Sequence, residues 1–185
     1  MTTHQGDVPS AWVARWARSI AAGDVLDLAC GRGRHARLCV ALGHAVLALD
    51  RDPDALRAAA GPGIVTHCVD LEAEGASWPF APGRFAGVIV TNYLHRPLFG
   101  ALAAALRPGG MLVYETFARG NEAFGKPSNP AFLLAPGELL DMAHRHGLHV
   151  LAYEDGVIQA SRAARVQRLC AVRAADDLSS TPLDL

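Results

Sequence analysis

Short apolar runs alternate along this chain with segments in which apolar residues recur every three or four positions. Runs of the first kind predict buried strands, and the second spacing is typical of amphipathic helices. Most of the helical segments begin near a proline or end just before a glycine. The predicted strands are Val25–Ala29, Ala45–Leu49, Ile64–Val69, Phe85–Val90, Met111–Thr116, His149–Tyr153 and Val166–Val172. The predicted helices are Val8–Ala22, Arg34–Leu42, Pro53–Ala60, Pro97–Leu106 and Pro136–His146.

The alternation of strands and helices predicts the fold class. Right-handed crossovers between successive strands give an α/β, doubly wound, Rossmann-like sheet with helices on both faces. The last two strands have no helical pattern between them, so we expect them to pair as an antiparallel hairpin at one edge. The prediction is a seven-stranded, mostly parallel sheet with its last strand antiparallel, formed by all 185 residues as a single domain. Such sheets bind ligands outside the carboxyl ends of their strands, where the strand order reverses.

The first predicted strand ends in a glycine-rich turn that opens directly into a helix. Gly31 and Gly33 permit backbone conformations that other residues avoid. A helix N-terminus leaves backbone N–H groups unpaired, so this turn is a candidate ligand site. Asp27 stands inside the strand, four residues before the first glycine. Its negative charge favours a ligand that carries positive charge.

Composition and charge exclude several classes of protein. Half of the residues are hydrophobic (51%), which is typical of a compact globular protein, and no apolar run is long enough to cross a bilayer. The short polar N-terminus lacks the features of a signal peptide, so we expect a cytoplasmic protein. The net charge of −1 gives no strong attraction to nucleic acid or membranes. The four cysteines form no metal-ligand or disulfide pattern, so we expect no metal site; they are Cys30, Cys39, Cys68 and Cys170.

Four motifs stand in order at the ends of the predicted elements. They are the turn Asp27–Gly33, Asp50 after the second strand, Asp70-Leu71 after the third, and Arg107-Pro108-Gly109-Gly110 before the fifth. With these motifs the chain resembles the class I S-adenosylmethionine (SAM)-dependent methyltransferases over nearly its whole length. Its compact layout is similar to the small-molecule and tellurite-resistance-like branch of that class.

The resemblance implies SAM as the cofactor and gives each motif residue a role. Asp50 would accept hydrogen bonds from both ribose hydroxyls, a contact that suits a carboxylate. Backbone groups at Ala29, Gly31 and Gly33 would hold the aminoacyl part of SAM, and Asp27 would orient its ammonium group.

The same resemblance places the adenine and the sulfonium. Asp70 would accept a hydrogen bond from the adenine amino group, with Leu71 and Arg51 beside the ring. Thr91 and Asn92, just past the fourth strand, would border the sulfonium. Taken one at a time, these aspartates are equally typical of turns and helix caps, so the implied site depends on the motifs occurring together.

Two other functions fit the glycine-rich turn. Gly31-x-Gly33-x-x-Ala36 also matches a dinucleotide fingerprint, which is typical of an oxidoreductase. A pyrophosphate beside Asp27 would bring like charges together in a partly desolvated site, which disfavours that alternative. A module that binds SAM without transferring its methyl group also fits the pattern.

Methyl transfer requires mainly that the nucleophile is positioned and water is excluded. The segment after the fourth strand supplies three candidates for this chemistry. We expect His95 to accept a proton or orient the acceptor, Tyr93 to shape the methyl channel, and Arg96 to bind an anionic acceptor. His95 and Arg96 also immediately precede a predicted helix, so loop contacts are the competing interpretation.

A second group of candidates follows the fifth strand. Glu115, Phe117 and Asn121 mix acidic, aromatic and amide groups, and we expect them to contact the acceptor. Residues 117–135 have no helical or strand periodicity, and a loop of this length is often functional. We expect either a lid over the site or a solvated connection.

The sequence favours a small-molecule acceptor. No Asn-Pro-Pro-Tyr segment stands where enzymes that methylate exocyclic or amide nitrogen carry it. Without an added domain, we expect these residues to have little surface for gripping a macromolecule. Arginines near the C-terminal end have no accompanying aromatic stacking groups, which weakens an interpretation as an RNA methyltransferase. These arginines are Arg162, Arg165, Arg168 and Arg173. Methyl transfer to RNA or protein stays the alternative, and the pattern does not indicate an oligomeric state.

Overall fold

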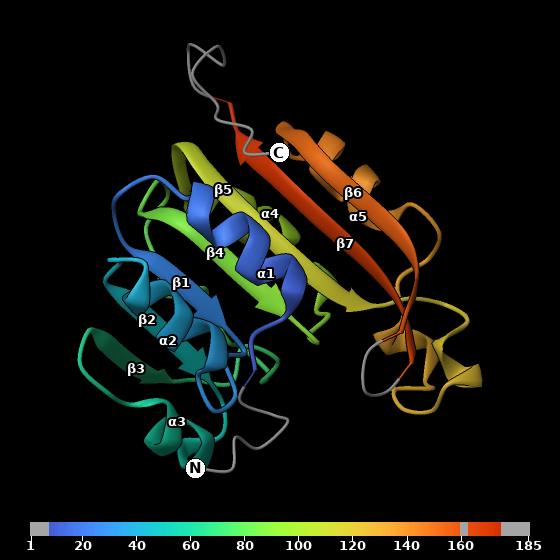
Figure 1. Ribbon diagram of the computed structural model, residues 1–185, viewed down its shortest axis with the longest axis horizontal. Helices are drawn as coiled ribbons and strands as arrows, with labels where there is room; N and C mark the ends of the chain where they lie inside the picture. Colours follow the sequence, from blue (N-terminus) through green and yellow to red (C-terminus); the bar gives the residue numbers. More distant parts are fainter. Residues whose placement is uncertain (1–7, 160–162, 175–185) are drawn as a thin grey trace.

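A seven-stranded sheet with helices on both faces forms the molecule (Figure 1). The computed structural model describes residues 8–159 and 163–174. The strand order is β3-β2-β1-β4-β5-β7-β6, with β1 to β5 parallel and β7 antiparallel to both of its neighbours. The strands are β1 (Val25–Leu28), β2 (Val46–Asp50), β3 (Ile64–Cys68), β4 (Phe85–Thr91), β5 (Leu106–Phe117), β6 (Leu148–Ile158) and β7 (Ala164–Arg173). The predicted fold class and the reversed last strand are confirmed.

Two separate apolar clusters pack the two faces of the sheet. Successive residues of a strand point to opposite faces, so Val88 and Val90 of β4 join one cluster and Ile89 joins the other. The first cluster is covered by α4 (Phe99–Ala105) and α5 (Glu138–Arg145). The second is covered by α1 (Ala11–Trp16), α2 (Arg34–Ala41) and α3 (Pro53–Ala59), and Figure 1 shows α1 crossing in front of the sheet.

Several boundaries differ from the sequence prediction. The predicted helix Val8–Ala22 is shorter, because Ser10 caps α1 by accepting a hydrogen bond from the Trp12 N–H at 3.2 Å. The chain then continues as a short 3-10 helix, Ala17–Ser19. The helix predicted for Pro97–Leu106 is a 3-10 turn, Arg96–Leu98, followed by α4.

The glycine-rich motif before the fifth strand lies inside β5. Leu106 already pairs with Phe85, and a register shift separates this pair from Gly87↔Met111. Gly110 is required within this bulge, because a Cβ there would lie 2.8 Å from the Arg107 carbonyl oxygen. The turn predicted before the strand is therefore a bulge within it.

The last two strands are longer than predicted and place β7 between β5 and β6.

Among the described helices, none is long and apolar enough to span a membrane.

Candidate active site

The carboxyl ends of four parallel strands meet where the strand order reverses. β1 pairs with β2 on one side and β4 on the other, so the crevice above β1 and β4 is the switch point of the sheet. The glycine-rich turn leaves β1 here, Asp50 ends β2, and Thr91 ends β4. The topology thus brings the glycine-rich turn and Asp50 to the end of β4, whereas the Arg107–Gly110 motif lies near the start of β5, at the opposite edge of the sheet.

The turn after β1 has an unusual backbone. Ala29 has a φ of 51° and Gly31 a φ of 54°, both in the left-handed region. Alanine is rare in this conformation, and such positions concentrate at functional sites. The Gly31 N–H donates to Asp50 Oδ2 at 2.8 Å, which ties the turn to the end of β2.

The two glycines of the turn are required for different reasons. A Cβ on Gly31 would meet no atom within 4 Å, so this face of the turn is open to a ligand. A Cβ on Gly33 would lie 2.7 Å from the Cβ of Ala59. Gly33 therefore permits the close packing of α2 against α3, in addition to its positive φ of 78°.

Asp27 is fully buried beneath this turn. Its Oδ2 accepts a hydrogen bond from the Ala36 N–H at 2.9 Å, whereas Oδ1 has no partner among the described residues. Burial raises the pKa of the Asp27 carboxyl to about 7. A buried acceptor without a donor is uncommon and points to a missing partner.

A small cavity of about 120 Å³ lies beside the ends of β2 and β3. It brings together four residues that the sequence assigns to the nucleoside part of the cofactor: Asp50, Arg51, Asp70 and Leu71. Arg51 Nη1 lies 4.0 Å from Asp70 Oδ2. Ala29 also lines this cavity, at its junction with the turn.

Tyr93 lines the same small cavity, although the sequence places it in the methyl channel. Burial raises the pKa of its phenol, so the hydroxyl is neutral at physiological pH. The Tyr93 carbonyl accepts a hydrogen bond from the Tyr114 hydroxyl at 2.9 Å, which fixes the backbone next to Asn92.

These groups fit SAM. The exposed face of Gly31 leaves room for the backbone to approach a ligand. Each carboxylate oxygen of Asp50 accepts one backbone N–H, from Gly31 or Asp52, and keeps a second lone pair for a ribose hydroxyl. The unpartnered Asp27 oxygen leaves a free hydrogen-bonding position below the turn. This set suits a cationic ligand rich in hydrogen-bond donors.

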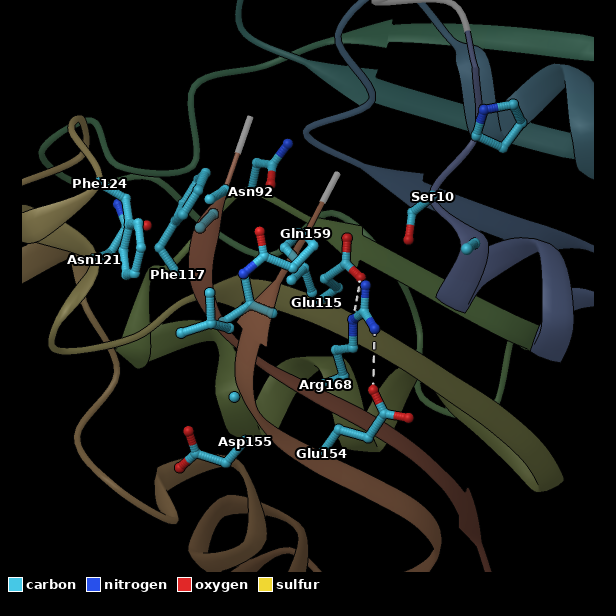
Figure 2. A pocket seen from close by; sticks show the side chains of 18 of the residues that line it. Ser10, Asn92, Glu115, Phe117, Asn121, Phe124, Glu154, Asp155, Gln159 and Arg168 are labelled. Carbon is cyan, nitrogen blue, oxygen red and sulfur yellow. Dashed lines mark hydrogen bonds and ion pairs between the residues drawn. The ribbon is translucent and has the colours of Figure 1, made fainter. Parts of the chain in front are cut away.

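A much larger cavity, of about 920 Å³, opens beyond the ends of β4 and β5 (Figure 2). Asn92, Glu115, Phe117 and Asn121 line it, so the structure collects four predicted site residues from three segments of the chain. Asn92 has a φ of 55°, the only non-glycine residue besides Ala29 with positive φ in the described part of the chain.

A row of charges across three strands forms the polar part of this cavity. Arg168 of β7 lies directly opposite Glu115 of β5 and Glu154 of β6. Its Nε donates to Glu115 Oε2 at 2.6 Å, and its Nη1 donates to Glu154 Oε2 at 3.0 Å (Figure 2). The guanidinium also lies 5.8 Å from the centre of the Trp12 ring.

His35 is a residue of the site that the sequence analysis misses. Its Nε2 accepts a hydrogen bond from the Ser10 N–H at 3.1 Å, so the ring proton is on Nδ1, which lies 3.3 Å from Thr91 Oγ1. Burial lowers the pKa of this imidazole to about 3, so the ring is neutral. His35 thus joins the turn after β1 to the end of β4 and to the N-terminal segment. Nothing in its spacing distinguishes it from an ordinary buried helix residue.

Neither Arg96 nor His95 lines either of the two cavities. The Arg96 guanidinium pairs with Glu138 and donates to the carbonyl oxygens of Ala131 at 2.8 Å and Leu133 at 3.0 Å. Arg96 therefore fastens the segment after β5, and these bonds occupy the donors that an anionic acceptor would need. His95 precedes the 3-10 turn Arg96–Leu98 and is partly buried.

Residues 117–135 fold into a compact segment with two 3-10 turns, Asn121–Ala123 and Pro130–Phe132. Asn121 is buried, and its amide joins the segment to itself and to β7 by donating to the Pro127 carbonyl and accepting from the Arg165 N–H. It lines the larger cavity while its side chain is used within the protein.

The arginines near the C-terminal end have partners inside the molecule. Arg165 pairs with Asp155, Arg168 with the two glutamates, and Arg173 donates to the carbonyl oxygens of Ala104 and Leu106. Arg162 lies outside the described residues. Over residues 8–159 and 163–174, no three metal-ligating side chains cluster.

The strand order is that of the class I methyltransferase fold, which solved SAM-dependent methyltransferases also adopt. Residues 25–110 match the profile of the methyltransferase domain family. The resemblance noted in the sequence is thereby confirmed, and so are methyltransferase as the enzyme class and SAM as its cofactor. No curated protein sequence matches the chain significantly.

Solved structures share the fold at low sequence identity. TehB from Haemophilus influenzae superposes with a TM-score of 0.70 at 18% identity, over 94% of this chain and 63% of TehB. A SAM-dependent methyltransferase from Mesorhizobium loti gives 0.67 at 21% identity, over 86% of this chain and 98% of that chain. The [4+2]-cyclase SpnF gives 0.67 at 16% identity, over 89% and 80%.

Proposed function

We propose that this protein transfers the methyl group of SAM to a small-molecule acceptor held in the larger cavity. The observation that supports the proposal is the position of this cavity of about 920 Å³, beside Asn92 and Arg34 and therefore next to the turn after β1. Its volume falls within the range of small-molecule sites, roughly 300–1,000 Å³.

The residues of the smaller cavity and the turn would hold SAM. Asp50 would bind the ribose hydroxyls, and Asp70 would accept from the adenine amino group. The open backbone at Gly31 would carry the aminoacyl part, with the Asp27 carboxyl beneath it. When bound, SAM supplies a methyl group on a positively charged sulfur, which is a good leaving group.

The chain's own contribution to the reaction would be to position the acceptor and exclude water. Thr91 would hold the end of β4 through His35, which places the neighbouring Asn92 at the larger cavity. Glu115 and Phe117 are the proposed acceptor contacts. Tyr93 and His95 are weaker candidates for contacts with the acceptor, because neither lines that cavity.

The arginine contacts support a small molecule over RNA. An RNA site requires cationic side chains that are free to meet phosphates. Arg165, Arg168 and Arg173 are each engaged with carboxylates or carbonyl oxygens of the same chain.

The fold also supports other chemistry, as the [4+2]-cyclase demonstrates, so the test follows the methyl group itself. The purified protein is incubated with SAM labelled in its methyl group and with separate pools of bacterial metabolites, RNA and protein. We expect label to enter the metabolite pool and S-adenosylhomocysteine (SAH) to form in equal amount. Label in the RNA or protein pool alone would contradict the small-molecule acceptor, and SAH binding without transfer to any pool would favour a binding module.

A further inference from the structure

The mouth of the larger cavity carries an unusual share of exposed apolar side chains. Val8, Phe124 and Val157 are 57%, 38% and 43% exposed, and they are three of the six large hydrophobic side chains exposed on the described surface. All three line this cavity, although they come from the N-terminal segment, the segment after β5, and β6. Apolar side chains gathered around one opening mark a binding site for an apolar group.

A row of charged side chains, Glu115, Arg168 and Glu154, also lines the cavity and carries surplus negative charge. The Glu115 side chain is 7% exposed, and Arg168 is its one described hydrogen-bond donor, to Oε2. Oε1 therefore stays available as an acceptor. Two carboxylates, of Glu115 and Glu154, share the single guanidinium of Arg168, so this row has a net charge of −1.

Arg34 and Lys126 also line the cavity as cations, so the surplus negative charge belongs to the Glu115–Arg168–Glu154 row alone. Asp155 pairs with Arg165. Lys126 is exposed on the segment after β5 that also carries Phe124. An anionic group placed against Glu115 would face like charge in a partly desolvated site, which is unfavourable.

We infer that the acceptor is an amphipathic organic molecule whose polar head donates an O–H or N–H hydrogen bond to Glu115 and whose apolar body contacts Val8, Phe124 and Val157. This inference rests on the proposed function. It narrows the acceptor to alcohols, phenols and amines with an apolar body, and it disfavours an inorganic oxyanion or a carboxylate head at Glu115.

The test uses three probes that share one apolar body: 4-phenylbutan-1-ol, 4-phenylbutylamine and 4-phenylbutanoate. Their binding to the full chain saturated with SAH is measured by calorimetry. We expect the alcohol or the amine to bind at least roughly tenfold more tightly than the carboxylate, about 1.4 kcal/mol.

Variants at the mouth of the cavity test the apolar contacts. Phe124→Ser is expected to weaken the binding of the preferred probe by roughly tenfold, because the variant loses the contact between the half-exposed ring and the ligand. Phe132→Ser is the matched control, since Phe132 is 49% exposed on the same segment and does not line the cavity. Val157→Ser and Val65→Ser form a second such pair on the two edge strands of the sheet.

Glu154→Gln tests the charge balance without disturbing a buried group, since this side chain is 51% exposed. It is expected to reduce the discrimination against 4-phenylbutanoate. Equal or tighter binding of the carboxylate by the unaltered chain would overturn the inference, and so would the absence of binding by all three probes. SAH binding is measured in the same experiment, and its loss would instead contradict the proposed function.

Discussion

At the scale of single residues, the buried carboxyl of Asp27 makes the stability of the fold depend on pH. Burial raises the pKa of its carboxyl from 3.8 to about 7. Between these values the folded chain keeps a proton that the unfolded chain releases. Since the unfolded state then binds fewer protons, the free energy of unfolding falls as the pH rises from about 4 to 7 and levels off above that.

Asp27→Asn is expected to remove this pH dependence. The stability advantage of the unaltered chain over the variant should be about 2–3 kcal/mol larger at pH 5 than at pH 8. Urea unfolding of both proteins at the two pH values measures this difference. If the advantage is the same at both, the buried carboxyl does not titrate in this range.

The sequence predicts which residues lie together where their position follows from local order, and it fails where their position depends on strand pairing. Asp50, Asp70 and Leu71 follow strand ends directly, so parallel topology alone brings them to one cavity. Arg168 is different, because its partner Glu115 is far along the chain and meets it only through the antiparallel register of β5 and β7. No periodicity within either strand indicates that register.

At the scale of elements, the segment of residues 117–135 is held at its base. The Leu134 N–H donates to the Phe117 carbonyl at 3.0 Å, and the Arg119 N–H donates to the Leu134 carbonyl at 2.9 Å. Arg96 adds the contacts to Ala131, Leu133 and Glu138. The base of residues 117–135 is thus fixed to the rest of the fold, and Phe124, farther along the segment, lines the cavity.

Arg96→Lys is expected to loosen this base, because an ammonium group cannot replace the planar guanidinium in three directions at once. Amide hydrogen exchange in residues 129–134 should accelerate by roughly tenfold, while the central strands stay unchanged. Mass spectrometry of the exchanged peptides measures the effect. Arg57→Lys, an exposed arginine paired with Asp54, is the control. Equal exchange in both variants would show that Arg96 does not hold the segment.

The sequence also predicts the elements better than their ends. Helices and strands are recovered because apolar periodicity reports burial directly. The start of β5 is not predicted correctly. The Pro108-Gly109-Gly110 segment is typical of a turn, but it lies within a paired, bulged strand. β6 and β7 extend beyond their predicted ends because they pair with each other. Polar residues at the cavity take part in this pairing, and the apolar pattern does not indicate them.

At the scale of the whole molecule, the fold follows from the alternation of elements, whereas the larger cavity does not. Its walls come from the N-terminal segment, from the ends of β4 and β5, and from the β6–β7 pair (Figure 2). A wall assembled from distant segments has no signature along the chain. The residues proposed to hold SAM, in contrast, lie within residues 25–110, the part of the chain that matches the methyltransferase domain.

Calorimetric titration of the purified protein with SAH, and separately with NADH, tests the central claim that the turn after β1 binds a SAM-type ligand. We predict binding of one SAH per chain and no binding of NADH. Asp50→Ala should weaken the binding of SAH by roughly 10–100-fold through loss of charge-assisted hydrogen bonds. Asp52→Ala removes only the cap of α3 and should leave the SAH affinity nearly unchanged. Binding of NADH without binding of SAH would contradict the account.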